Sequence, residues 1–210
     1  EISKQVLQMH IPVDYRDPKY KQTLLMLATS TNKIESVEKL LELGANPNAH
    51  DDSTKYFGES AVLLACRFTR PSSKVLALLL KYGGDPNSTA CGVQEDGLGD
   101  IVPMREFALS AAVFSSFEKV KLLVDAGANI NYETTTESCA IENCMIHGRM
   151  DIMLYLLLKG ADYRRKFTEI DSDKPDYPTF EVDILYKLRK CVYPIGSKAY
   201  NEKMKVVDFL

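Results

Sequence analysis

The chain of 210 residues has a hydrophobic fraction of 45% and a formal net charge of −3. A hydrophobic share of this size supports a continuous core and argues against disorder. Both signs of charge are mixed along the chain, so the basic surface that binds a phosphate backbone is missing and no nucleic-acid partner is expected. The longest apolar stretches, 75–80 and 153–158, fall far short of the roughly 20 residues that span a bilayer, and no transmembrane segment is predicted.

Four segments of the chain end in the same way. In each, a glycine stops a leucine-rich run, and an Asn or Asp follows two residues later. Glycine can take the left-handed conformation that ends a helix, and Asn or Asp favours the turn beyond it. A small residue stands sixteen residues before three of these glycines and eighteen before Gly83, where paired helices would approach closely. The glycines are Gly44, Gly83, Gly127 and Gly160, and the small residues are Ala28, Ala65, Ala111 and Cys144.

This unit of helix, tight turn, helix and glycine stop resembles the ankyrin repeat. The clearest match is Thr-Leu-Leu-Met-Leu-Ala at 23–28, with the run at 34–41 and its glycine stop. Gly127 and Gly160 are 33 residues apart, the length of an ankyrin repeat. The other spacings are longer because the connections between repeats, which we call fingers, are longer. The first helices lack the Thr-Pro-Leu-His opening that is usual in the family. The resemblance implies an all-α fold, an ankyrin-repeat solenoid of four to five helix-turn-helix units with long irregular finger loops.

We expect one domain over 1–210. Segment 1–22 is predicted to hold an N-terminal cap, with a capping helix over 2–9, and the first finger. Segment 163–210 is predicted to be a divergent, truncated C-terminal repeat, with helical spacing at 180–188 and again at 204–210. The repeat cores between these segments are 23–48, 60–87, 106–131 and 139–162.

The first helix of an ankyrin repeat faces the concave side, so the resemblance implies that the two residues after its pair of small residues point outward. Four of the residues at these positions are strongly apolar, and such a stripe usually marks a contact surface. The alternative is that a long finger folds back and covers them. The positions hold Ser30, Thr31, Arg67, Phe68, Val113, Phe114, Ile146 and His147.

The fingers supply further candidate contacts. The finger at 88–105 is rich in glycine and acidic residues, shows no helical or strand period, and presents Glu95 and Asp96. Its acids lack the alternating spacing of a calcium loop. Tyr56, Phe57 and Tyr132 lie on other fingers and are predicted to be aromatic anchors for a partner.

No catalytic or metal-binding arrangement is predicted. Cys139 and Cys144 occupy places in the repeat that packing explains, and His147 has no second base nearby in the sequence, so neither a thiol nucleophile nor a zinc site is expected. The five cysteines should be free thiols, most of them in the core. We therefore expect that the protein is not an enzyme and that it binds no cofactor and no metal.

These features favour a module for protein-protein interaction. Divergent ankyrin arrays with irregular fingers resemble the bacterial immunity proteins that bind lipase effectors of type VI secretion. That resemblance implies an inhibitor, or antitoxin, that neutralises a toxic effector enzyme such as a phospholipase. It also implies that the protein is located in the bacterial periplasm, with a lipid anchor preceding Glu1. The alternative location is the cytoplasm. The second hypothesis is an ankyrin adaptor or secreted effector that recruits host or cytosolic proteins.

Overall fold

The computed structural model describes residues 12–51, 58–67, 69–95, 101–103, 106–133, 139–171, 174, 176 and 178–210. It divides into two compact units, Glu1–Asn129 and Ile130–Leu210, called unit 1 and unit 2 below. The predicted capping helix at 2–9 lies outside the described residues. Within the described part of the chain, no helix is long and apolar enough to cross a membrane.

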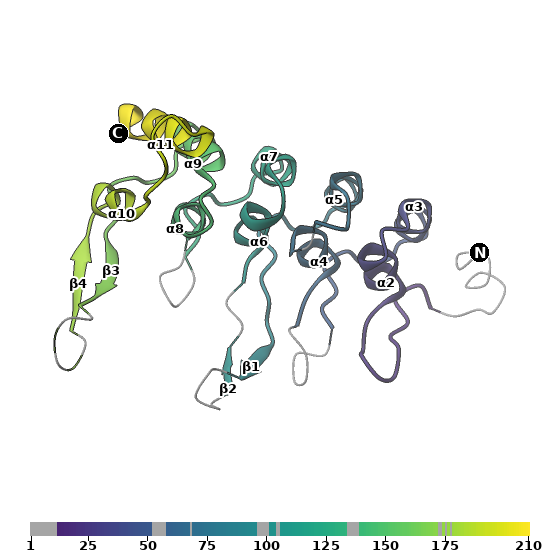
Figure 1. Cartoon of the computed structure of the whole chain (residues 1–210). Helices are drawn as coiled ribbons and strands as arrows, with labels where there is room; N and C mark the ends of the chain where they lie inside the picture. Colours follow the sequence, from purple (N-terminus) through teal and green to yellow (C-terminus); the bar gives the residue numbers. More distant parts are fainter. Residues whose placement is uncertain are drawn as a thin grey trace. The chain divides into compact units, whose positions relative to one another are not determined.

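Unit 1 contains three antiparallel helix pairs arranged in two rows. The inner helices α2, α4 and α6 pack side by side, and the outer helices α3, α5 and α7 form a second row on them (Figure 1). A finger precedes each inner helix. The bounds are α2 (Leu24–Ser30), α3 (Ile34–Glu42), α4 (Ala61–Arg67), α5 (Ser73–Lys81), α6 (Ala108–Ser115) and α7 (Phe117–Asp125).

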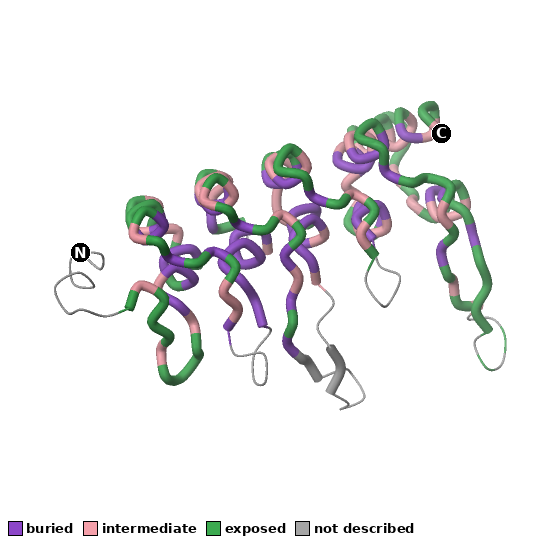
Figure 2. Tube along the Cα trace, turned by 180° about the vertical axis from the view of Figure 1, so that it is seen from behind, coloured by how far each residue is buried: buried purple, intermediate pink, exposed green. Residues whose placement is uncertain are grey.

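The core of unit 1 lies between the two rows. The helix α4 shows this most clearly, because Ala61 to Cys66 are all buried between the neighbouring repeats. In the burial view the helices are mostly buried where they face one another, and exposed residues gather on the outer side of the outer helices (Figure 2). Each of the segments 23–48, 60–87 and 106–131 contains one of these helix pairs.

The glycine stops adopt the predicted conformation. Gly44, Gly83, Gly127 and Gly160 have φ between 87° and 96°. At the first of them, the N–H of Gly44 donates to Leu41 O and the N–H of Ala45 donates to Leu40 O, each at 3.0 Å. The same pair of bonds closes the other three outer helices, and it satisfies carbonyl groups that a helix end leaves without partners. The residue two positions later then accepts a backbone N–H, as predicted: Asn46 from Asn48 and Asp85 from Asn87.

A column of asparagines joins successive repeats along these turns. Asn48 Nδ2 donates to Gly83 O at 2.9 Å, and Asn48 Oδ1 accepts the N–H of Asp85 at 2.7 Å. Asn87 Oδ1 accepts the N–H of Asn129 at 2.7 Å in the next repeat. Asp14 stands at the head of the column and accepts the N–H of Asn46 at 2.9 Å. Segment 12–22 therefore supplies the first repeat with the contact that each later repeat receives from its predecessor.

Unit 2 contains a fourth helix pair, a hairpin and two further helices. The outer helix α9 packs on the inner helix α8 and on the C-terminal helix α11. Asn131 Oδ1 accepts the N–H of Asp162 at 2.8 Å, which continues the same turn contact inside this unit. The elements are α8 (Ala140–Ile146), α9 (Met150–Leu158), β3 (Phe167–Ile170), β4 (Thr179–Val182), α10 (Ile184–Lys190) and α11 (Lys198–Phe209).

Two fingers contain strands that the sequence analysis did not predict. In the finger at 88–105, β1 (Val93–Glu95) pairs antiparallel with β2 (Ile101–Pro103). In the C-terminal segment, β3 pairs antiparallel with β4, and Phe180 lies in this hairpin and not in the predicted helix. The helix begins only at Ile184, after Asp183 caps it by accepting the N–H of Tyr186 at 2.8 Å. The description all-α was therefore wrong in detail, and mostly helical is correct.

Candidate functional site

The start of each inner helix fixes which of its residues face outward. Thr23, Phe107 and Cys139 are the N-cap residues of α2, α6 and α8, and Ser60 directly precedes α4. Counted from these starts, Ser30, Arg67, Phe114 and Ile146 occupy the same place on their helices, seven residues on. The small residue at the equivalent place in the third repeat is therefore Ala112 and not Ala111. The positions predicted from the sequence were displaced by one residue in that repeat.

Val113 was wrongly predicted to be an exposed contact residue, because it is fully buried. The cause is the turn between α6 and α7. Ser116 is at once the C-cap of α6 and the N-cap of α7, whereas the first repeat has Thr31 and Lys33 in these two roles. Counting backward from Gly127 therefore misplaced the inner helix. Val113 takes the core position that Thr29 and Cys66 take in their repeats.

Phe114 and Ile146 are exposed as predicted. The side chain of Phe114 is 63% exposed at the end of α6 in unit 1, and that of Ile146 is 68% exposed at the end of α8 in unit 2. His147, the C-cap of α8, is exposed beside Ile146. Each unit thus presents a large apolar side chain at the same place on an inner helix.

Arg67 occupies the equivalent place on α4, and its guanidinium is directed to two carboxylates. Nη1 lies 2.7 Å from Glu59 Oε1, and Nε lies 3.1 Å from Glu106 Oε2. The side chain is about three-quarters buried. Arg67 therefore lies between the bases of two fingers. The sequence had instead predicted that this side chain contacts a partner directly.

The predicted contacts on the fingers are described only in part. Phe68, Tyr56, Phe57 and Asp96 lie outside the described residues. The backbone of Glu95 belongs to β1, and its side chain lies outside the described residues. Tyr132 is half-buried at the start of the finger that precedes α8.

The cysteines behave as the sequence indicated. All five are free thiols, and Cys66, Cys139 and Cys144 are buried. Burial raises the pKa of the Cys66 thiol to about 12, and it also raises the pKa of the Cys139 and Cys144 thiols. A thiol with a raised pKa is a poor nucleophile at neutral pH. Among the described residues, no group of three or more His, Cys, Asp and Glu side chains could hold a metal ion.

An apolar hollow at the first finger was not predicted from the sequence. A cavity of about 340 Å³ lies between this finger and α2, and Tyr15, Tyr20, Leu24 and Leu27 line it. Tyr15, Tyr20 and Leu27 are each close to half exposed. Leu27 could have been found by applying the helix period to α2, because it precedes Ser30 and Thr31 on the same outward side.

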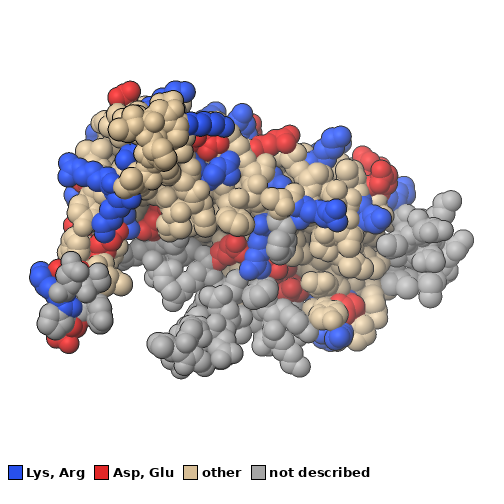
Figure 3. Space-filling view, in the orientation of Figure 1, with Lys and Arg blue, Asp and Glu red and all other residues tan. Residues whose placement is uncertain are grey.

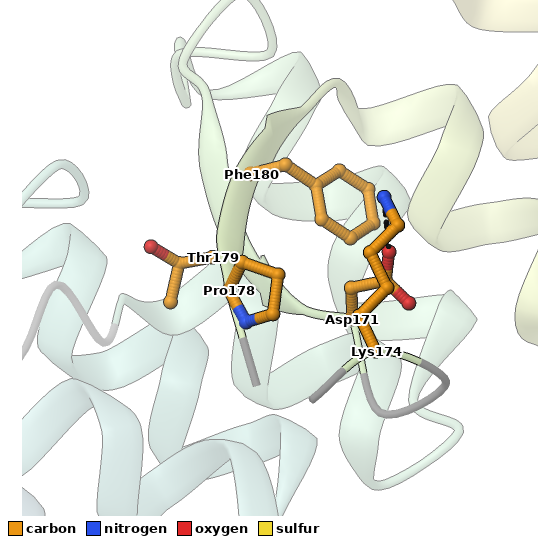
Figure 4. A pocket seen from close by; sticks show the side chains of 5 residues that line it. All are labelled: Asp171, Lys174, Pro178, Thr179 and Phe180. Atoms are coloured by element: carbon orange, nitrogen blue, oxygen red, sulfur yellow. Dashed lines mark ion pairs between the residues drawn. The ribbon is translucent and has the colours of Figure 1, made fainter. Parts of the chain in front are cut away.

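A second hollow lies on the hairpin of unit 2. Its volume is about 360 Å³, and Asp171, Lys174, Pro178, Thr179 and Phe180 line it. The ring of Phe180 lies on the same side of the hairpin as Asp171 and Lys174, which pair at 3.0 Å (Figure 4). Because Asp171 and Lys174 already pair with each other, neither charge attracts a charged ligand strongly. We therefore do not assign a small-molecule site to this hollow.

On the face of the molecule shown in Figure 3, the described Lys and Arg side chains are interspersed with Asp and Glu side chains. The net charge of −3 likewise does not favour a nucleic-acid partner.

Comparison with known proteins supports the interpretation of the repeats. Residues 20–52 match the family model of the ankyrin repeat. The match begins at the end of the first finger and covers α2, α3 and the glycine stop, and it supports an ankyrin-repeat protein. Comparison with curated proteins finds no match. Ankyrin repeats indicate a module for protein-protein interaction.

Proposed function

We propose that this chain binds another protein through the exposed side chains of its inner helices and the adjoining fingers, and that the bound protein is an enzyme whose activity is blocked. The observation that carries the proposal is the exposure of Phe114 and Ile146, 63% and 68%, at the same place on α6 and α8. Packing within the repeats does not require a large apolar side chain there, because Ser30 occupies the same place on α2.

The energy available from these side chains is enough to matter for binding. A phenylalanine buries about 150–250 Å² when it is covered completely. At 63% exposure Phe114 retains about 100–150 Å² for a partner, which corresponds to about 2–4 kcal/mol at roughly 25 cal/mol per Å². Part of this is offset by the cost of association, so each of these side chains acts as an anchor only together with further contacts on its own unit.

An inhibitor of this kind needs no chemistry of its own. Helix pairs closed by hydrogen-bonded turns give a surface that changes little on binding, which lowers the entropy cost of association. Covering the entrance of an active site is then sufficient to stop catalysis. The resemblance to bacterial immunity proteins supports a toxic effector enzyme as the target, with a phospholipase as the specific candidate.

Affinity capture from the source organism tests the proposal. The bait is the wild-type chain, with Phe114→Asp and Ile146→Asp as test variants. Leu158→Asp is a matched control, because Leu158 is 66% exposed but lies on the outer helix α9. Bound proteins are identified by mass spectrometry, and the activity of any captured enzyme is assayed with added bait.

The proposal predicts one enzyme that is captured by the wild type and by Leu158→Asp, is lost with the two inner-helix variants, and is inhibited by the bait. Capture of several unrelated proteins without inhibition would favour the adaptor hypothesis. Equal capture by Ile146→Asp and Leu158→Asp would show that the inner-helix face is not the binding surface.

A further inference from the structure

Two neighbouring fingers of unit 1 are paired strands at their bases. In the second finger His50 bridges Ser60, and the N–H of Asp51 donates to Glu59 O at 3.0 Å. In the third finger Thr89 bridges Phe107, and the N–H of Ala90 donates to Glu106 O at 2.9 Å. Both fingers extend from the inner helices α4 and α6 on the same side of the unit (Figure 1). Each base is therefore a short antiparallel ladder that leads directly into a helix.

The two bases also contact each other. The N–H of Cys91 in the third finger donates to Gly58 O in the second at 3.1 Å. Ser60 Oγ and Ser88 Oγ are 2.6 Å apart, and both side chains are buried. A Cβ on Gly58 would lie 2.4 Å from the backbone N of Gly92, so the backbones are as close as only glycine permits. We call this contact the finger junction.

Arg67 closes the finger junction with charge. Glu59 and Glu106, one in each finger, each stand two residues before the first residue of an inner helix. Arg67 lies 2.7 Å from Glu59 and 3.1 Å from Glu106. Glu59 is only 4% exposed. A carboxylate this deeply buried needs a paired cation, since an isolated buried charge is very unfavourable. One arginine therefore holds one carboxylate from each finger.

Asp51 adds a third carboxylate among the described residues at the base of the second finger. It is buried and accepts the N–H of Glu59 at 3.0 Å. Burial raises the pKa of Asp51, Glu59 and Glu106, although Arg67 lowers the pKa of the two glutamates. The other titratable groups that interact with these carboxylates or their neighbours are His50, Cys66, Cys91 and Lys119.

We propose that Arg67 is a positioning residue, whose two ion pairs hold the bases of the second and third fingers together and thereby set the surface to which a partner binds. The link to a partner rests on the proposed function, whereas the closure of the finger junction does not. Arg67 thus acts through Glu59 and Glu106 and does not need to touch the partner.

The charge of the carboxylates determines how much the junction depends on Arg67. A carboxyl whose pKa is raised in the closed junction binds a proton more readily when the junction is closed than when it is open. Lowering the pH from neutral therefore favours the closed junction, because burial raises the pKa of Glu59 and Glu106 and they bind protons more readily there. Without Arg67 the closed junction must bury unpaired carboxylates at neutral pH, but not once they are protonated.

Hydrogen exchange of the Cys91 amide reports the junction directly, because this N–H is bonded across it to Gly58 O. Protection factors, corrected for intrinsic exchange, are measured by NMR at pH 8 and pH 5 for the wild type, Arg67→Gln and Arg67→Lys. Amides within α5 serve as the reference for the stability of the unit as a whole.

We expect Arg67→Gln to lower the protection of the Cys91 amide at least tenfold at pH 8 and by a smaller factor at pH 5. Arg67→Lys should restore part of the protection. Equal protection in the wild type and Arg67→Gln at pH 8 would overturn the proposal. A loss that is the same at both pH values would also overturn it, because that result indicates a packing role without charge.

A second variant covers the case in which Arg67→Gln does not fold. In Arg67→Gln combined with Glu59→Gln and Glu106→Gln, no buried glutamate charge remains to be paired, so the Cys91 amide should regain wild-type protection at pH 8. Failure to regain it in a folded protein would contradict the role of charge.

Binding to the captured partner separates the two parts of the account. If the partner binds the wild type, Arg67→Gln should weaken binding at least tenfold at pH 8 and Arg67→Lys should restore part of it. Unchanged affinity with an open junction would overturn the positioning role and leave the proposed function intact. Failure of the wild type to bind any enzyme, with the exchange results as expected, would remove the proposed function while the junction stands.

Discussion

Replacement of Asn48 by alanine should loosen the contact between the first two repeats. Asn48 forms two hydrogen bonds to the following turn, a donation to Gly83 O at 2.9 Å and an acceptance from the N–H of Asp85 at 2.7 Å. Alanine removes both. Because Asn48 and its partners are exposed, water replaces part of what is lost, and each bond should contribute about 0.5–1 kcal/mol. The free energy of unfolding should therefore fall by about 1–2 kcal/mol.

Urea denaturation followed by circular dichroism measures this change. With a slope of about 1–3 kcal/mol per molar urea, the midpoint should fall by roughly 0.5–1 M. Asn48→Asp keeps the acceptor but loses the donation to Gly83 O and places a carboxylate against that carbonyl, so it should lose at least half as much.

Asn46→Ala is the matched control, because Asn46 Oδ1 accepts only a local bond, from the N–H of Asn48 at 2.9 Å. In a repeat protein an interface between repeats contributes to cooperative unfolding, whereas a bond within one turn contributes less. If Asn48→Ala proves no more destabilising than Asn46→Ala, the side-chain column does not couple the repeats and this reasoning is wrong.

Three further results are expected. Val113→Ser should lower the free energy of unfolding by about 2–3 kcal/mol, because it removes buried methyl groups and buries a hydroxyl. Phe114→Ser should lower it by less than about 1 kcal/mol. If Phe114→Ser had the lower urea midpoint instead, Val113 would be the exposed residue, as first predicted from the sequence. Gly127→Ala should cost about 1–2 kcal/mol, because φ is 91° there and an added Cβ meets no atom within 4 Å, so only backbone strain acts. In native protein at pH 8, Ellman's reagent should modify the exposed Cys91, although burial raises the pKa of this thiol and slows the reaction, and should leave the three buried cysteines unreacted until urea is added. Rapid reaction of Cys144 would show that the core is open.

The sequence predicted the repeating part of the fold well because the repeat has strong local signals. Glycine after a leucine-rich run marks the end of an outer helix, and all four such glycines have the expected left-handed backbone. Asp or Asn two residues later makes the expected turn bond. These signals act within a few residues, so a single sequence is enough to read them.

The errors arose where a distance was counted through a turn of variable length. Val113 was assigned to the surface because the turn between α6 and α7 was assumed to match the others, and the shared cap at Ser116 shortens it. A count from the start of α6 would have placed Val113 correctly. That start is hard to see, since Phe107 makes no side-chain capping bond of the kind that Thr23 and Asp183 make.

The hairpins and the finger junction could not be predicted from the sequence, for a different reason. Strands of three or four residues, such as β1 and β3, give little alternation to detect. The pairing of Arg67 with Glu59 and Glu106 joins two fingers, and only the packing of α4 beside α6 brings these residues together. The outward-facing positions at the ends of the inner helices could be predicted from the repeat, whereas the carboxylates that pair with Arg67 could not.

The central claim is that the inner-helix face binds the partner. Hydroxyl-radical footprinting of the captured complex, compared with the free chain, measures which side chains the partner covers. The account predicts that oxidation of Phe114 and Ile146 falls severalfold while oxidation of Leu158, which is equally exposed on an outer helix, stays unchanged. Protection of Leu158 with Phe114 and Ile146 still reactive would place the partner on the outer helices and contradict the account.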